Sequence, residues 1–333
     1  MGKTRNSYYD FLKGLAIMGV VAIHTMVFNF EPYSLTGGSV AVFRNLLGCC
    51  VPFFVAVSGY FLCNKEISTK FAYSNFIKTR LLTVYRPMLI WGLPWLLLGL
   101  LSVKKLTSFC YVMGMYFLGG LSILYFIMLI IELYLLLPVI QKVNKKGVFF
   151  LSMASIVVTC GWSLVIYAFN IHPPLIVYCS FPTYIGFFAL GCYLGKKQTS
   201  VKVRYSISII ILGLVLAVVE SYYWLNYNPA NNWLGLKPSV QLLAFGVILL
   251  LFSRKLSDTY KSTKVKQIVE WFGVQSMSIY MSHMLVKFAL NIVGFTPSLW
   301  VTNWIVVFAL DIILIFILIK FLPGKILPYL GIR

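Results

Sequence analysis

Acidic residues are scarce in this chain of 333 residues. It holds 8 Asp and Glu against 28 Lys and Arg, so its formal net charge is +20, yet charged residues are only 11% of it. A soluble domain has about 25% charged and about 45–50% apolar residues, whereas 60% of this chain is hydrophobic. A folded soluble protein must present polar groups to water, so one soluble core could not accommodate this excess. The composition excludes a soluble enzyme, a nucleic-acid-binding domain and a disordered tail, and it predicts an integral membrane protein.

Several other signatures are missing. There is no strand-period pattern long enough for a barrel, no internal repeat and no low-complexity tract, so we expect residues 1–333 to form a single transmembrane domain without an appended soluble domain. The 7 cysteines include no CxxC pair and no metal-ligand spacing. Most of them lie in or near apolar runs, where a free cysteine behaves as a small hydrophobe. An outer-face disulfide through Cys49 or Cys110 stays open.

Ten apolar runs divide the chain. Crossing a bilayer takes about 20 residues, because a helix rises about 1.5 Å per residue and the hydrocarbon layer is roughly 30 Å thick. The sixth and eighth runs are short, which leaves their limits the least defined. The sequence predicts an all-α bundle of about ten transmembrane helices. The runs are Phe11–Phe30, Val40–Leu62, Leu81–Ser102, Gly119–Ile140, Val148–Phe169, Phe181–Leu194, Tyr205–Leu225, Pro238–Phe252, Ser276–Gly294 and Trp300–Leu322.

The distribution of Lys and Arg gives this bundle an orientation. With both termini cytoplasmic, 23 of the 28 basic residues fall on inner segments and 5 on outer ones, as the positive-inside rule predicts. The first run follows Lys3 and Arg5 like a secretion signal, but it is long and lacks a small-residue cleavage site. We therefore expect it to be a retained first helix of a multi-pass plasma-membrane protein. The composition, rich in Ile, Phe, Tyr and Lys, suggests a bacterial source.

Few ionisable residues lie inside these runs, where they are costly and usually face the bundle interior. His24 lies past the midplane of the first run, and an imidazole there suits a general base that takes a proton from an alcohol. A buried histidine bonded to a carbonyl is an equally good interpretation. Lys13 precedes His24 by eleven positions and so lies on nearly the same helix face. By itself, Lys13 is more typical of a lysine that extends its amine to the inner interface.

These residues also carry a resemblance. The segment Tyr8–Ala16 followed by His24 is similar to the opening signature of the membrane-bound acyltransferase 3 family. Further segments resemble the same family in order along nearly the whole chain. They are Val51–Leu62, Ile77–Leu82 with Arg86 and Pro87, Tyr125 and Phe126 through Tyr134 and Pro138, Phe187–Gly195, and Ser278–His283.

The resemblance implies an enzyme that moves an acyl group, often acetyl, from cytoplasmic acyl-CoA to an acceptor at the outer face. Typical acceptors are hydroxyls of cell-wall or surface glycans, and the family's basic residue and histidine on the first helix correspond to Lys13 and His24. Two departures stand out. Lys13 replaces the common arginine, which exchanges a bidentate phosphate contact for a point charge. The family's paired arginines at the third helix appear as Arg80 followed by Thr83, with Arg86 displaced.

A mechanism follows as a hypothesis. Lys13, Arg80 and Arg86 would bind the CoA phosphates, with Lys78 as a further candidate, and His24 would deprotonate the acceptor hydroxyl. Glu132 is the first candidate for a carboxylate that orients the imidazole, by the logic of the serine-protease triad. The alternative role for Glu132 is a salt bridge to a basic residue. An acyl-enzyme through Ser58 is conceivable, although serine beside glycine more often serves close helix packing.

The remaining polar residues are weaker candidates. His283 belongs to a resembling motif and is either a supporting residue or a structural one. Glu220 and Asp311 are as well explained as interior partners of Lys or Tyr, and His172 as a solvated loop histidine. The outer loop 226–233 is rich in amides and aromatics, which suit a sugar but suit an interfacial loop better.

We therefore predict a membrane O-acyltransferase, with acyl-CoA as co-substrate, membrane lipids as its surroundings, and a glycan or lipid-linked saccharide as acceptor. No bound cofactor, metal or nucleic acid is expected. The competing hypothesis is a transporter of a small metabolite or amino acid, related to the same family but without acyl transfer.

Overall fold

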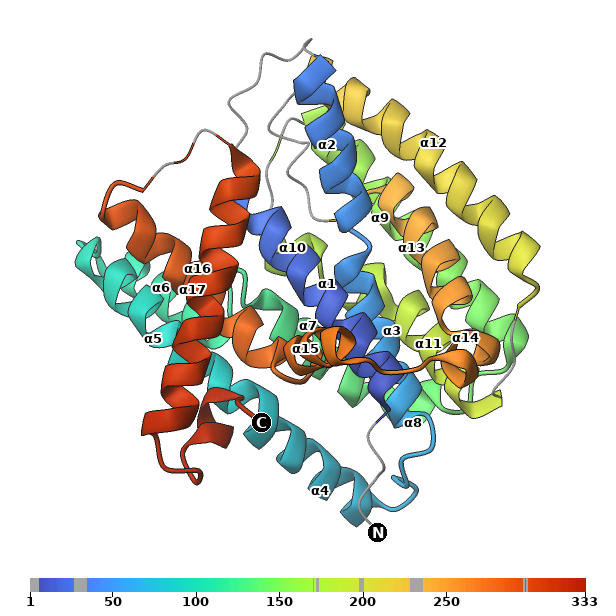
Figure 1. Cartoon of the computed structure of the whole chain (residues 1–333), viewed down its shortest axis with the longest axis horizontal. Coiled ribbons are helices and arrows are strands. Elements are labelled where there is room, and N and C mark those ends of the chain that lie inside the picture. The colour runs from blue at the N-terminus through green and yellow to red at the C-terminus, as the bar shows by residue number, and fades with distance from the viewer. Residues whose placement is uncertain are drawn as a thin grey trace.

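The computed structural model describes residues 6–26, 35–169, 171, 174–197, 201–227, 236–295, 297 and 299–333. In these residues the regular structure is entirely helical (Figure 1). The helices are α1 (Ser7–Thr25), α2 (Leu35–Leu47), α3 (Cys50–Leu62), α4 (Lys70–Arg80), η1 (Leu81–Tyr85), α5 (Arg86–Leu101), α6 (Leu106–Phe117), α7 (Tyr125–Leu135), α8 (Leu137–Ile140), α9 (Lys145–Phe169), α10 (Leu175–Tyr178), α11 (Phe181–Lys197), α12 (Val203–Tyr227), α13 (Pro238–Leu251), α14 (Arg254–Thr259), α15 (Lys264–Val274), α16 (Ser276–Ile292), α17 (Trp300–Phe321) and η3 (Leu327–Leu330).

Five helical segments of the described chain are long and apolar enough to cross a membrane. They are Gly38–Leu62, Lys70–Leu101, Lys145–Phe169, Val203–Tyr227 and Trp300–Phe321. The other five predicted runs correspond to shorter helices of 11 to 19 residues. These helices are α1, α7, α11, α13 and α16. The predicted class, an all-helical membrane protein, is confirmed, while the number of ten spans stays a prediction.

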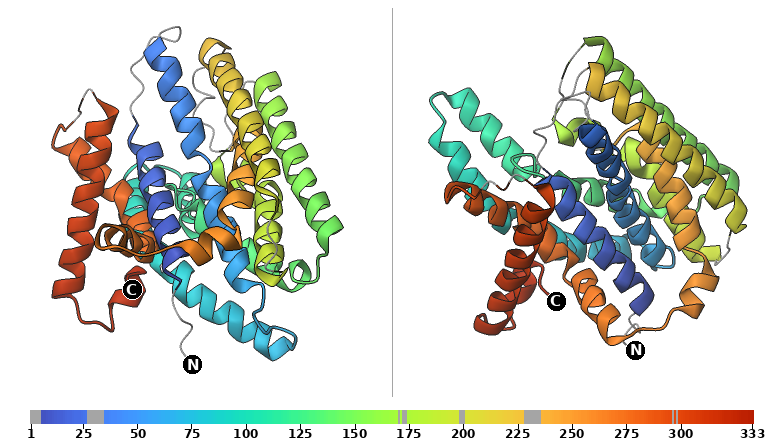
Figure 2. Two further views of the ribbon diagram at one scale, coloured as in Figure 1. Left: turned by 45° about the vertical axis from the view of Figure 1, so that its right-hand side comes forward. Right: turned by 45° about the horizontal axis from the view of Figure 1, so that its top comes forward.

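Close helix packing sets the centre of the bundle. Helix α3 lies against α11, and α9 covers the other side of α11 (Figures 1 and 2). Glycines permit this approach, since a Cβ on Gly191 would lie 2.0 Å from the Ala56 carbonyl oxygen and one on Gly59 would lie 2.2 Å from that of Phe188. In lipid there is no hydrophobic driving force between helices, so the close van der Waals packing that small residues permit holds such crossings together.

Helix α1 begins and ends earlier than the predicted run Phe11–Phe30. The Asn6 side chain accepts a hydrogen bond from the Tyr9 backbone N–H at 3.4 Å, which satisfies one free donor at the helix start. The helix ends at Thr25, so His24 lies in its last turn. Residues 27–30 of the predicted run lie outside the described residues.

The run Gly119–Ile140 was predicted as one helix, and the structure corrects this. Residues 118–124 are not helical, Gly119 has a φ of 67°, and α7 begins only at Tyr125. Before this break lies α6, which the apolar runs did not include and which packs against α5 (Figure 1). The Tyr280 hydroxyl donates to the Ile123 carbonyl, so a group left free by the break is satisfied. Non-helical backbone in a membrane protein is tolerated where it is buried or lines a cavity.

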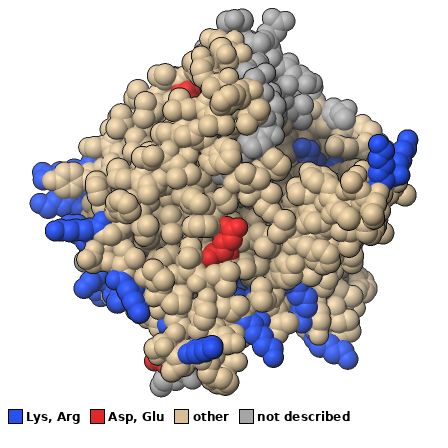
Figure 3. Space-filling view, turned by 180° about the vertical axis from the view of Figure 1, so that it is seen from behind, with Lys and Arg blue, Asp and Glu red and all other residues tan. Residues whose placement is uncertain are grey.

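The third predicted run, Leu81–Ser102, belongs to a longer helical segment. It starts at Lys70 with α4, whose Thr69 cap accepts from the Ala72 N–H at 3.1 Å, and it passes through the π-helical turn η1 into α5. Helix α4 crosses the lower edge of the molecule in Figure 1. Viewed from behind, Lys and Arg gather mainly along the lower part and the edges, and the area between them is largely uncharged, with acidic side-chain atoms exposed near its centre (Figure 3).

Candidate active site

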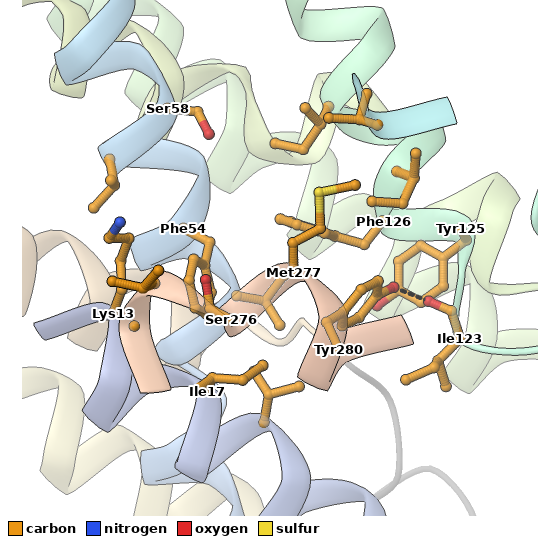
Figure 4. A pocket seen from close by; sticks show the side chains of 18 of the residues that line it. Lys13, Ile17, Phe54, Ser58, Ile123, Tyr125, Phe126, Ser276, Met277 and Tyr280 are labelled. Carbon is orange, nitrogen blue, oxygen red and sulfur yellow. Dashed lines mark hydrogen bonds between the residues drawn. The ribbon is translucent and has the colours of Figure 1, made fainter. Parts of the chain in front are cut away.

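A cavity of about 180 Å³ lies among α1, α3, α7, α15 and α16. Its walls are mostly apolar and aromatic, and Figure 4 shows Ile17, Phe54, Phe126 and Met277 around it. Ile123, from the break before α7, also lines it. The irregular backbone therefore forms part of the cavity wall.

Lys13 and His24 line this same cavity. Both lie on α1, eleven residues apart, which separates them by about 16 Å along the helix axis at about 1.5 Å per residue. The sequence prediction that the two side chains share one interior groove is what the structure shows. The Lys13 amine also forms an ion pair with Asp10, with 2.6 Å between Nζ and Oδ1.

The backbone around His24 is fixed by side chains from two neighbouring helices. Lys287 on α16 donates to the His24 carbonyl, and the Asn303 amide on α17 donates to the Thr25 carbonyl at 2.7 Å. The last carbonyls of a helix have no partner within it and carry the negative end of its dipole. A lysine and an amide are therefore well suited to hold this end.

A second histidine lies beside the first. The rings of His24 and His283 have centroids 5.5 Å apart, and His283 is completely buried. Its Nδ1 lies 3.0 Å from the Ile279 carbonyl oxygen. Because a carbonyl only accepts, Nδ1 carries the proton in a neutral ring and Nε2 is left as an acceptor. Among the described residues Nε2 has no hydrogen-bond partner.

Glu132 is bound at the start of α11. Its carboxylate accepts a hydrogen bond from the Phe181 backbone N–H at 2.9 Å, at the start of α11, and Glu132 is not among the residues that line the cavity. A carboxylate there complements the positive end of the helix dipole. Within the described residues Glu132 has this partner and no hydrogen bond to His24, so the structure gives the predicted pairing of the two no support.

The predicted phosphate-binding residues lie in different places. The Arg80 guanidinium lies 5.6 Å from the ring centroid of Tyr134, a residue of the cavity wall. Lys78 is exposed on α4, and Arg86 stacks over Tyr329 at 3.6 Å. Neither Lys78 nor Arg86 lines the cavity.

Ser58 lines the cavity from α3, as Figure 4 shows. The other polar candidates have structural partners. Glu220 accepts from the Ser239 backbone N–H at 3.2 Å, and Asp311 accepts from Ser282 Oγ at 2.5 Å. His172 and residues 228–233 of the amide-rich loop lie outside the described residues.

One cavity residue escaped the sequence analysis. Arg333 follows the last apolar run, and only the folded structure brings it to the cavity wall. Together with Lys13 it gives the described wall two cationic side chains, and no acidic side chain lines this wall. Such a lining favours an anionic ligand.

The cavity is largely apolar, Lys13 and His24 line it about 16 Å apart along α1, and such a lining fits a ligand with an anionic part and an apolar part. The chain matches the model of the acyltransferase 3 family, described as an acyltransferase domain, over residues 6–320. It therefore belongs to that family, which confirms the resemblance and supports a membrane acyltransferase. Comparison with curated proteins and with solved structures gives no match.

Proposed function

We propose that the protein is an O-acyltransferase, with acetyl as the acyl group, that takes this group from cytoplasmic acyl-CoA and transfers it to a hydroxyl of an extracytoplasmic saccharide. The observation that carries the proposal is that Lys13 and His24 line one continuous cavity. A cation suits the anionic end of the donor, and an imidazole suits deprotonation of the acceptor. The family supports acyl transfer as the reaction class.

Toward the Lys13 end of the cavity, the phosphates of the donor meet positive charge. Lys13 lines the wall, and Arg80 lies behind Tyr134. The apolar stretch between Lys13 and His24 would hold the pantetheine arm, with the thioester reaching toward His24. Lys78 and Arg86 lie outside the wall, so we assign them to the approach of the donor and to support of the structure, respectively.

Toward the other end, His24 acts as general base. A ring nitrogen takes the proton of the acceptor hydroxyl while the oxygen attacks the acyl carbon and the carbon–sulfur bond breaks. The proton then passes from the imidazolium to the departing thiolate, which gives free CoA and an acyl ester. Since Glu132 caps α11, we assign the support of the His24 ring to His283 instead. Ser58 lies on the wall as an alternative acyl carrier.

Transfer across the membrane needs a defined orientation. We propose ten spans with both termini in the cytoplasm of a bacterial cell, because this topology places 23 of the 28 basic residues inside. In this orientation the start of α1 and Lys13 face the cytoplasmic donor, and His24 faces the acceptor.

The test is acyl transfer by purified protein in liposomes, with radiolabelled acetyl-CoA on the cytoplasmic side and cell-envelope glycans as acceptors. We expect label transfer and CoA release by the wild type. His24→Ala should lower kcat by about 100-fold or more, the range for loss of a general base. Lys13→Ala should raise KM for acetyl-CoA, whereas Lys105→Ala, at an exposed position before α6, should leave both constants unchanged.

A different result would favour the transporter. If the wild type neither binds acetyl-CoA nor releases CoA with any envelope acceptor, the acyltransferase proposal is overturned. Uptake of a labelled metabolite into the same liposomes would then be measured.

A further inference from the structure

We propose that Arg333 is a donor-binding residue that contacts a phosphate group of acyl-CoA and supplies the second cation that the third-helix segment lacks. The proposal rests on the proposed function, because it assigns a phosphate-bearing donor to the same cavity. Arg333 lines this cavity together with Lys13.

The third-helix segment itself brings little positive charge to the cavity wall. Thr83, three positions after Arg80, is exposed, and its hydroxyl donates to the Thr79 carbonyl at 2.9 Å. The Arg86 guanidinium lies over the Tyr329 ring at 3.6 Å. Of these three residues, only Arg80 has its charged group next to a residue of the cavity wall, Tyr134.

Residues 326–333 bring Arg333 to the cavity by folding back against the bundle. Tyr329, beneath Arg86, belongs to the short helix η3, and the Trp91 indole on α5 donates to the Leu330 carbonyl at 3.1 Å. Gly331 then turns the chain with a φ of 71°, a conformation that costs glycine little. Ile332 is 2% exposed, so the segment is anchored immediately before Arg333.

Gln275 holds the backbone of Arg333 from both sides. Its side-chain oxygen accepts from the Arg333 N–H at 3.1 Å, and its side-chain nitrogen donates to the Arg333 carbonyl. Gln275 is 1% exposed and joins α15 to α16, beside the wall residues Val274 and Ser276. A buried amide that pairs with one residue in this two-sided way fixes the position from which the arginine side chain extends.

The charge balance at this end of the cavity favours a role for Arg333. Lys13 is paired with Asp10, which reduces the net charge that Lys13 offers a ligand. Within the described residues no acidic side chain forms an ion pair with Arg333, and its side chain is accessible. Arg80 lies 5.6 Å from the ring centroid of Tyr134, which lines the cavity together with Arg333. A guanidinium donates two parallel hydrogen bonds to a phosphate, which a lysine cannot do.

The test compares donors with and without phosphates in the purified full-length protein in liposomes. For Arg333→Gln we expect KM for acetyl-CoA to rise about 10-fold or more, as for loss of one charge-assisted hydrogen bond, with little change in kcat. With acetyl-pantetheine, which has no phosphate, Arg333→Gln and wild type should have equal kcat/KM. Lys325→Gln, an exposed cation in the neighbouring loop, is the matched control and should behave as wild type with both donors.

Gln275→Ala gives a second, independent variant. Gln275 is a positioning residue, so Gln275→Ala should raise KM for acetyl-CoA only through its effect on Arg333. The double variant Gln275→Ala with Arg333→Gln should therefore have a KM no higher than Arg333→Gln alone. Unchanged KM in Arg333→Gln, or an equal loss with acetyl-pantetheine, would overturn the role of Arg333. Failure of the wild type to bind acetyl-CoA would instead overturn the proposed function, and with it this assignment.

Discussion

At the scale of single residues, the proposed chemistry depends on the pair His24 and His283. The Ile279 carbonyl fixes the tautomer of His283, so its buried Nε2 is an acceptor next to the ring of His24. An acceptor there can receive an N–H of His24, orient that ring and stabilise the imidazolium that forms when it takes the acceptor's proton. The support that a triad obtains from a carboxylate would come here from a second imidazole.

This arrangement predicts the behaviour of two variants of His283. His283→Ala should lower kcat about 10- to 100-fold and leave KM for acetyl-CoA unchanged, because the residue acts on His24 and not on the phosphates. His283→Gln keeps one donor and one acceptor and should recover part of the rate. Steady-state kinetics in liposomes measures both, and a wild-type kcat in His283→Ala would exclude the supporting role.

Residue by residue, the sequence predicts the site where the relation is local. Lys13 and His24 share a face of one helix, and helical periodicity is enough to bring them together. Glu132 and Arg86 have other partners, Phe181 and Tyr329, that lie far away in the chain, and no spacing rule connects them. The cavity position of Arg333 depends in the same way on a turn at Gly331.

At the scale of elements, the crossing of α1 and α15 holds the Lys13 end of the cavity in place. A Cβ on Gly14 would lie 1.9 Å from the Val269 carbonyl oxygen, and one on Gly273 would lie 1.8 Å from that of Asp10. The two backbones are therefore in direct contact, and the hydrogen bond between Gln275 and Arg333 also links the end of α15 to the C-terminal segment.

Alanine at either glycine should separate the two helices. We expect Gly14→Ala and Gly273→Ala each to destabilise the protein by about 1–3 kcal/mol, the range for overpacking in a filled interior. Gly161→Ala on α9 is the matched control, since a Cβ there meets nothing within 4 Å and alanine favours a helix. Thermal unfolding in detergent measures all three, and an equal Tm for Gly14→Ala and Gly161→Ala would contradict the crossing.

Hydrophobic runs predict which segments are helical better than they predict where helices break. The run Gly119–Ile140 is largely apolar, yet its first residues are not helical. Ile123 among them lines the cavity, and its carbonyl accepts from the Tyr280 hydroxyl. Hydropathy measures only the transfer of side chains into an apolar phase. It does not report a hydrogen bond from a distant helix, so it cannot predict a break that such a bond stabilises. Helix α6 was missed for a related reason, since its 12 residues are too few for a span.

At the scale of the whole molecule, the direction of transfer depends on which face of the bundle lies in the cytoplasm. Lys13, Arg80 and Arg333 must face the donor, and they belong to segments that the distribution of basic residues places inside. Of the five basic residues that the predicted topology places on outer segments, Lys287 donates to the His24 carbonyl at the end of α1. The same orientation thus serves membrane insertion and the proposed chemistry.

Labelling of single cysteines tests this orientation directly. Cys110 is the one exposed thiol among the described residues, so it is first replaced by serine. Lys104→Cys, between α5 and α6, should react with a membrane-impermeant maleimide in intact cells, because this loop is predicted to lie outside. Lys145→Cys, at the start of α9, should react only after the membrane is permeabilised. If Lys145→Cys reacts in intact cells and Lys104→Cys does not, the predicted topology is inverted, and His24 would no longer face an extracytoplasmic acceptor.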